Sequence, residues 1–260
     1  TLVVAGDLIK QLASTYNSKI IPVDSEHSAI YQCLTGENIK DIEKIYLTAS
    51  GGPFLNFSED ELDTVTCEDA LKHPNWNMGN KITIDSATMM NKGFEAIEAK
   101  WLFDLEPDQI DVIIHPQSII HSLVQFVDGS IKAQMGLPDM KLPILYALSA
   151  PNRVESQFKR FDFTDYPQLT FQKPDTKKFR NLAIAFEAME KGGNVPCVAN
   201  AANEVAVDAF LNSKIGYKDI SYVVEQSIEK IDYIEHPNLE DYIKTDRETR
   251  QLASEIIVNI

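Results

Sequence analysis

Carboxylates in two separate stretches of the sequence could together hold a metal ion. Asp24 and Glu26 flank Ser25 where a helical pattern begins, and Glu95 lies far along the chain. Carboxylates without cysteine or clustered histidine select a hard ion such as Mg²⁺ or Mn²⁺ over zinc. The spacing does not establish that the two stretches meet, because an ordinary helix start with Ser25 as its N-cap would contain the same residues.

Polar side chains in two other stretches of the sequence are of the types that bind a phosphate group. Ser50 precedes two glycines at the end of an apolar run, and Ser86, Asn91 and Lys92 lie in a polar stretch before Glu95. Hydroxyls, an amide and one ammonium are suited to a phosphate monoester. The glycines are equally compatible with a simple tight turn. The residues by themselves therefore predict a metal-dependent site for a phosphorylated sugar.

The elements that must position these residues follow from hydrophobic periodicity. A short helix is expected at 8–16. Glu95 is expected to lie on an amphipathic helix, because Phe94, Ile97 and Trp101 recur at helical spacing. Strands are expected at short apolar runs and in a hairpin turned by Asp128-Gly129, at residues 19–23, 45–49, 81–84, 111–115, 118–127 and 130–135.

The C-terminal part of the chain has a purely helical pattern. Helices are expected at 177–191, 199–211, 220–231 and 245–258, the last one opening with a capping box of Thr245 and Glu248. A proline-containing segment precedes them. The predicted fold is an α/β (α+β) catalytic domain with a mixed sheet (1–149), a connecting segment (150–176) and a small all-α C-terminal bundle of four helices (177–260).

Composition excludes several classes of protein. A net charge of −15 argues against a nucleic-acid partner, and no apolar run is long enough to suggest a membrane span. Cys33, Cys67 and Cys197 are odd in number and widely spaced, which fits a reducing compartment better than a disulfide framework or a zinc site. No glycine-rich nucleotide motif occurs.

Several sequence runs closely resemble the 1-deoxy-D-xylulose-5-phosphate reductoisomerase family. They occur in family order over nearly the whole chain, and several are long enough that chance is a poor explanation. The runs are PVDSEHSAI (22–30), SGGPF (50–54), HPNWNMG (73–79), DSATMMNKG (85–93), HPQS (115–118), GLPDM (136–140) and ANAANE (199–204).

The resemblance implies a role for each matching position. Asp24, Glu26 and Glu95 would hold a divalent cation (Mn²⁺, Mg²⁺ or Co²⁺), and His73 would act with them in catalysis. Trp76 and Met78 would belong to a flap, with Met78 and Gly79 lying against NADPH. Substrate contacts would come from Ser25, Glu26, Ser50, His73, Trp76, Ser86, Asn91, Lys92 and Glu95.

The same resemblance implies a reaction and a setting. The family converts 1-deoxy-D-xylulose 5-phosphate into 2-C-methyl-D-erythritol 4-phosphate in the non-mevalonate isoprenoid route. A homodimer in the cytoplasm is implied, with a plastid location left open and no nucleic-acid or membrane partner. Family members begin with an NADPH-binding domain that has no counterpart before Thr1. The chain is therefore expected to be the catalytic and C-terminal portions, binding metal weakly and turning over nothing by itself.

Two other functions fit the residues less closely. A metal-dependent sugar-phosphate isomerase or aldolase without redox chemistry would share the carboxylates and phosphate-binding groups but need no nucleotide domain. A non-catalytic interaction protein with a helical tail would not need the three acids. Glu98 is expected to pair with a basic group rather than bind the metal, and His115 and His121 are expected to be packed or surface residues.

Overall fold

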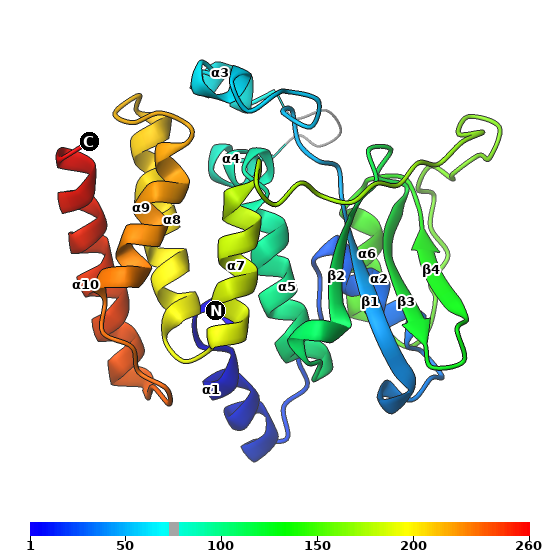
Figure 1. Ribbon diagram of the computed structural model, residues 1–260. Coiled ribbons are helices and arrows are strands. Elements are labelled where there is room, and N and C mark those ends of the chain that lie inside the picture. Colours follow the sequence, from blue (N-terminus) through cyan, green and yellow to red (C-terminus); the bar gives the residue numbers. More distant parts are fainter. Residues whose placement is uncertain (73–77) are drawn as a thin grey trace.

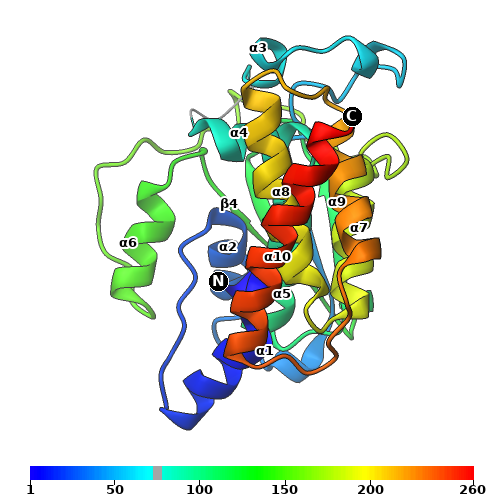
Figure 2. The same ribbon diagram turned by 90° about the vertical axis from the view of Figure 1, so that its left-hand side faces the viewer.

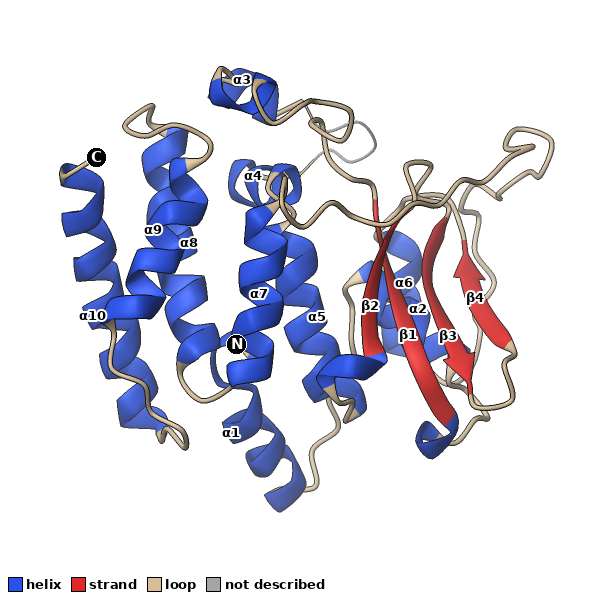
Figure 3. Ribbon diagram, viewed as in Figure 1, coloured by secondary structure: helices blue, strands red, loops and turns tan. Residues whose placement is uncertain are grey.

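A four-stranded sheet and a group of long helices lie side by side in this protein (Figures 1 and 3). The computed structural model describes residues 1–72 and 78–260. The strand order is β2-β1-β3-β4, with β1 parallel to β2 and antiparallel to β3, so the predicted mixed sheet is confirmed. Its strands are β1 (Ile42–Ala49), β2 (Ile110–Ile114), β3 (Ile120–Phe126) and β4 (Ile131–Met135).

The predicted hairpin between β3 and β4 is also confirmed. Gly129 has φ +84°, and its N–H donates to the carbonyl of Phe126 at 2.8 Å. Glycine adopts this left-handed backbone conformation without a Cβ penalty. The turn therefore fixes the register in which β3 presents its side chains.

Two of the predicted strands are wrong. Residues 19–23 form no regular element, since Pro22 lacks an N–H and the chain runs directly into the cap of the next helix. Residues 81–84 lie inside a helix, where Ile84 is fully buried while Ile82 is 36% exposed. Alternation over four residues cannot separate a strand from one turn of helix.

Helices pack against the sheet and form the whole C-terminal part. The first helix begins earlier than predicted, at Leu2. Residues Lys141–Ser149, which follow β4 in the sequence, form an unpredicted helix that lies at the periphery beside the helix Ser25–Cys33 (Figure 2). The helices are α1 (Leu2–Thr15), α2 (Ser25–Cys33), α3 (Cys67–Ala70), α4 (Asn80–Ala87), α5 (Met90–Phe103), α6 (Lys141–Ser149), α7 (Arg180–Lys191), α8 (Val195–Leu211), α9 (Asp219–Lys230) and α10 (Leu239–Val258).

The four predicted C-terminal helices appear as α7 to α10, but the predicted capping box is wrong. Asn238 caps α10, with Asp241 completing the box, while Thr245 is 3% exposed inside the helix. Thr245 instead accepts a hydrogen bond from Asn194 at 3.2 Å. A Thr–Glu spacing predicts a helix start only when no earlier cap competes.

One hydrophobic core joins the sheet to the C-terminal helices. Its buried members include Leu47 on β1, Ile97 on α5 and Leu182 on α7. At Gly93 a Cβ would lie 2.3 Å from the Cβ of Ala185, so the absence of a side chain lets α5 and α7 approach closely. The division into 1–149, 150–176 and 177–260 stays a prediction. Among the described helices, none has the length and apolar character needed to cross a bilayer.

Candidate metal and substrate site

Three acidic side chains from distant parts of the chain converge beside the sheet. Asp24 and Glu26 come from the N-terminus of α2, and Glu95 comes from α5. Each offers one carboxylate oxygen, and these oxygens all lie within 4.8 Å of one another. The convergence that sequence spacing could not establish is therefore present in the fold.

The start of α2 holds the first two acids in place. The expectation that Ser25 is the N-cap is wrong, because Asp24 occupies that position and accepts a hydrogen bond from the Glu26 N–H at 3.2 Å. Ser25 instead donates its hydroxyl hydrogen to Glu26 at 2.6 Å. An aspartate cap leaves the serine free to orient the second carboxylate.

His27 links the two halves of the cluster, a role that sequence reasoning missed. The residue is 1% exposed, and its Nε2 donates to the backbone carbonyl of Glu95 at 2.8 Å. Its Nδ1 lies 3.6 Å from Asp24 and 4.0 Å from Glu98. The only sequence signal was its position one turn after Asp24, on the face that turns toward α5.

A single buried ammonium lies between two of the acids. Lys92 is 6% exposed, and its Nζ donates to Glu26 at 2.8 Å and to Glu95 at 2.5 Å. Asn91 donates to the other Glu95 oxygen, also at 2.5 Å. Both carboxylates are therefore oriented by charge-assisted hydrogen bonds.

The cluster contains more negative charge than Lys92 can balance. Burial raises the pKa of Asp24 to about 6 and, together with the charge of Glu26, raises that of Glu95 well above its ordinary value. Burial favours the neutral form of Glu26 too, but Lys92 and the Ser25 hydroxyl lower its pKa to about 2. A set of three carboxylates, of which Glu95 is buried and Asp24 and Glu26 are partly exposed, with one ammonium beside them, suits an additional divalent cation with oxygen ligands.

The acids open onto a cavity of about 360 Å³. This volume is within the range of sites for small organic ligands, about 300–1,000 Å³. Of the residues predicted from sequence, those lining it are Asp24, Ser25, Glu26, Ser50, Met78, Ser86, Asn91, Lys92 and Glu95.

The structure does not place the other three predicted residues in the cavity wall, one because it lies elsewhere and two because they are not described. Gly79 is exposed at the N-cap of α4 and is not among the lining residues. His73 and Trp76 lie outside the described residues. Their predicted roles stay predictions.

His121 and Met140 also line the cavity, although sequence reasoning gave them no part in the site. His121 is on β3 and 6% exposed, and burial lowers the pKa of its imidazole. A neutral imidazole on the wall can donate or accept a hydrogen bond toward a ligand. Strand alternation alone could not show which face of β3 meets the cavity.

The loop after β1 brings Ser50 close to α4. Gly51 and Gly52 have φ values of +86° and +66°, and a Cβ on Gly52 would lie 2.9 Å from the backbone oxygen of Ser86. Ser50 accepts a hydrogen bond from the Gly52 N–H at 3.2 Å. The glycines thus permit both the left-handed turn and the close approach of two hydroxyl-bearing segments.

Substituting Gly52 by alanine is expected to displace Ser86 and to destabilise the protein by more than about 2 kcal/mol, because the left-handed conformation alone costs about 1–2 kcal/mol and the close contact with the Ser86 backbone adds to that cost. Chemical denaturation measures the change. Gly36→Ala is the control for φ, since Gly36 has φ +82° but open space around it. Equal changes in the free energy of unfolding for both substitutions would show that the contact with Ser86 does not contribute to stability.

Helix α4 is anchored from the C-terminal helices. Asp85 is 1% exposed, pairs with Lys81 and accepts a hydrogen bond from Asn203 of α8 at 2.8 Å. The neighbouring Ser86 is therefore held in the cavity wall by a contact between residues that are far apart in the sequence. This role for Asp85 and Asn203 depends on tertiary packing and could not be read from either motif.

Comparisons with known proteins agree over nearly the whole chain. Residues 20–103 match the model of the 1-deoxy-D-xylulose 5-phosphate reductoisomerase C-terminal domain, and residues 135–252 match that of the DXP reductoisomerase C-terminal domain. The 1-deoxy-D-xylulose 5-phosphate reductoisomerase of Phocaeicola vulgatus is 60% identical over 257 residues, covering 99% of this chain and 67% of that protein. That of Bacteroides fragilis is 59% identical, covering 99% and 66%.

Solved structures show the same similarity in three dimensions. The reductoisomerase from Zymomonas mobilis in complex with NADPH superposes with a TM-score of 0.93 at 44% identity, covering 100% of this chain and 67% of that one. A DOX-P reductoisomerase in complex with NADPH, fosmidomycin and magnesium superposes with a TM-score of 0.92 at 43% identity, covering 98% and 67%.

The chain spans about two thirds of the length of these relatives, from 66% to 67%. Within that span the similarity includes every stretch that contributes a described residue to the carboxylate cluster and its cavity. The chain belongs to the 1-deoxy-D-xylulose 5-phosphate reductoisomerase family.

Proposed function

We propose that this chain holds the divalent cation and the phosphorylated substrate of an enzyme that converts 1-deoxy-D-xylulose 5-phosphate into 2-C-methyl-D-erythritol 4-phosphate with NADPH. The observation that carries the proposal is the convergence of Asp24, Glu26 and Glu95 within 4.8 Å on the wall of the cavity. Named relatives at about 60% identity support the reaction.

The three carboxylates would hold Mn²⁺, Mg²⁺ or Co²⁺. When bound, such an ion acts as a Lewis acid toward carbonyl and hydroxyl oxygens of the substrate. NADPH supplies the hydride, and Met78 and Gly79 are proposed to face it. His27 keeps the two halves of the carboxylate cluster together through its bond to the Glu95 backbone.

The hydroxyls of Ser50 and Ser86, with Asn91 and Lys92, are proposed to bind the phosphate. Asn91 and Lys92 donate to Glu95 in this structure, so substrate oxygens must share or replace those hydrogen bonds. Ser25 is proposed to contact the substrate beside Glu26. Binding energy from the phosphate end can then orient the reacting end of the substrate. Closure of a flap carrying His73, Trp76 and Met78 is proposed to exclude water.

Turnover can be tested in a chimaera that joins this chain to the remaining third of the Phocaeicola vulgatus relative. We expect NADPH oxidation only when both 1-deoxy-D-xylulose 5-phosphate and Mn²⁺ are present. Mn²⁺ binding to the 260-residue chain alone, followed by electron paramagnetic resonance, is an independent readout. Substrate conversion without NADPH consumption would instead support the non-redox isomerase or aldolase.

We also propose that the chain forms a homodimer, without nucleic-acid or membrane partners. In the described part of the chain β4 is an edge strand, with Ile131 52% exposed and Val127 67% exposed beside it. Unpaired edges of this kind favour pairing with a second strand. Free cysteines and bacterial relatives support a cytoplasmic location.

Light scattering should give twice the chain mass of 29.2 kDa. Ile131→Lys is expected to shift the protein to the monomer, because it places a charge in the proposed contact. Val258→Lys, at a residue 85% exposed near the C-terminus, is the control and should leave the mass unchanged. A monomeric mass for the unaltered chain would contradict the proposal.

A further inference from the structure

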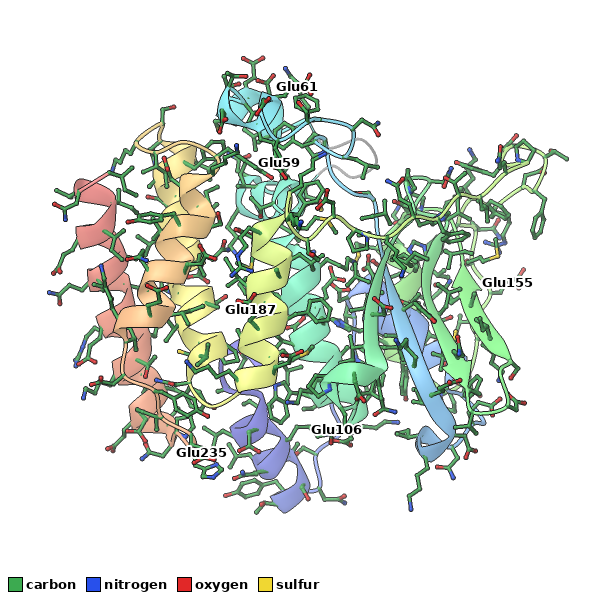
Figure 4. All side chains as sticks on the ribbon, in the orientation of Figure 1. Glu59, Glu61, Glu106, Glu155, Glu187 and Glu235 are labelled. Atoms are coloured by element: carbon green, nitrogen blue, oxygen red, sulfur yellow. The ribbon has the colours of Figure 1, made fainter. Side chains whose placement is uncertain are left out.

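A second cavity lies between the N-terminal ends of α7 and α9, at the upper ends of these helices in Figure 1. Its volume is about 150 Å³, and it shares no lining residue with the cavity beside the carboxylate cluster. Organic ligands usually occupy about 300–1,000 Å³, so this space suits a small ion. Glu59, labelled in Figure 4, contributes to its wall from the segment that leads to α3.

One buried side chain in this cavity has an unused hydrogen-bond donor. Asn181 is 3% exposed, and its Nδ2 has no hydrogen-bond partner among the described residues. Buried polar groups in native proteins nearly always have a partner, which includes bound water or an ion. The position of this amide on the cavity wall therefore indicates that something in the cavity accepts its hydrogen bond.

The basic residues around the cavity indicate that the acceptor is an anion. Lys177, Lys178, Arg180 and Lys218 line it, against Glu59 as the acidic lining residue among those described. Arg180 and Lys218 already pair with carboxylates outside it, whereas Lys178 donates to the neutral backbone oxygen of Leu55 at 2.8 Å. Lys177 has no ion-pair partner in the described part of the chain. Two ammonium groups are thus without a paired carboxylate.

The end of α7 adds to this positive field. The helix has twelve residues, no side chain caps its first turn, and no acidic residue lies in that turn. Free N–H groups and the helix dipole favour an anion at such an end. Ser221 on α9 lies on the other side of the cavity, where its hydroxyl donates to the carbonyl of Lys218 at 2.9 Å.

We propose that this cavity is a second oxoanion site, which binds a single phosphoryl group between α7 and α9. Asn181 and Lys177 provide side-chain donors that have no acceptor among the described residues, and Lys178 adds an ammonium that already donates to the Leu55 carbonyl. The site is separate from the proposed substrate phosphate position at Ser50 and Ser86, and it does not depend on the proposed reaction.

The test is a titration of the ¹⁵N-labelled chain with orthophosphate, following the side-chain amide signals of Asn181 by NMR. The Ser86→Ala background removes a donor from the other phosphate position. We expect a saturable shift of these signals, with methyl phosphate as a second probe that separates a free ion from a phosphate ester. Absence of a shift at about 10 mM of either probe, where a site with Kd about 1 mM would be nearly saturated, overturns the proposal.

Variants separate specific binding from a general effect of charge. Lys177→Glu changes an exposed residue and is expected to weaken orthophosphate binding about tenfold or more, because it reverses a charge beside the anion. Lys230→Glu makes the same charge change at the opposite end of α9 and should leave the affinity unchanged. Asn181→Leu, followed through the backbone amide of Arg180, should also weaken binding. Equal weakening by Lys177→Glu and Lys230→Glu would refute the site.

Discussion

Replacing Glu95 by glutamine is expected to lower the affinity of the chain for Mn²⁺ by about 100-fold or more and to abolish turnover in the chimaera. Loss of an outer partner of a metal ligand already costs about 10- to 100-fold, and Glu95 is one of only three carboxylates in the described cluster. Glutamine keeps the shape of the side chain but removes its charge. Calorimetric titration with Mn²⁺ measures the change.

The fold should tolerate this substitution. Glu26 would still pair with Lys92 at 2.8 Å, and the crowding of negative charge that raises the pKa of Glu95 would be relieved. The free energy of unfolding without metal is expected to change by less than about 1 kcal/mol. A loss of metal affinity in a well-folded protein therefore reports on binding and not on stability.

Glu98→Gln is the matched control on the same helix. Glu98 lies outside the group of three carboxylates, and within residues 1–72 and 78–260 its ion-pair contact is with His27, at 4.0 Å. Its substitution should change Mn²⁺ affinity by less than about threefold, the scale of a weak ion pair. If both variants lost the same affinity, or if Glu95→Gln kept normal affinity, Glu95 would not be a metal ligand.

Lys92→Met is expected to lower the stability of the chain without lowering its affinity for Mn²⁺, the reverse of Glu95→Gln. Removal of one partner from a buried ion pair costs about 3–5 kcal/mol because it leaves an uncompensated charge, and Lys92 is the partner of both Glu26 and Glu95. The chain should therefore be strongly destabilised in the presence of a chelator. Affinity for Mn²⁺ should be equal or higher, since the ammonium no longer competes for the same carboxylates.

Added metal should restore much of the stability lost in this variant. Ligand at 100 times its Kd stabilises a folded protein by about 2.7 kcal/mol. Chemical denaturation with chelator and with excess Mn²⁺ measures both values. Lys44→Met is the control, because the Lys44–Asp111 pair at 3.7 Å is half-exposed and worth about 0–1 kcal/mol. A Lys92 variant with unchanged stability in chelator would contradict the charge balance described for the site.

Local sequence patterns determined most of the elements of this protein. Strands β1 and β2, the β3–β4 hairpin, the helix that carries Glu95 and the four C-terminal helices follow from periodicity and from the Asp128-Gly129 turn. The errors lie where a local pattern is short or ambiguous. Residues 19–23 and 81–84 read as strands because four or five apolar-rich residues contain too little periodicity to separate strand from helix or loop.

Residues of the candidate site were named from the sequence, whereas the arrangement that brings the described ones together was not. Composition and spacing indicated an oxygen-ligand metal site with phosphate-binding groups, and family resemblance assigned the positions. Only the tertiary structure brings α2 and α5 together, through the bond from His27 to the Glu95 backbone, and places Lys92 between two acids.

The physical reason is that periodicity reports which face of an element is apolar, whereas a site depends on which elements meet. No local pattern connects Asn203 with Asp85, although the two side chains share a hydrogen bond. The same is true of His121 on the wall of the first cavity and of the α7 and α9 residues that line the second. The sequence by itself determined the chemistry available to this protein. Packing of distant segments decided where that chemistry is concentrated, and how its charges are balanced.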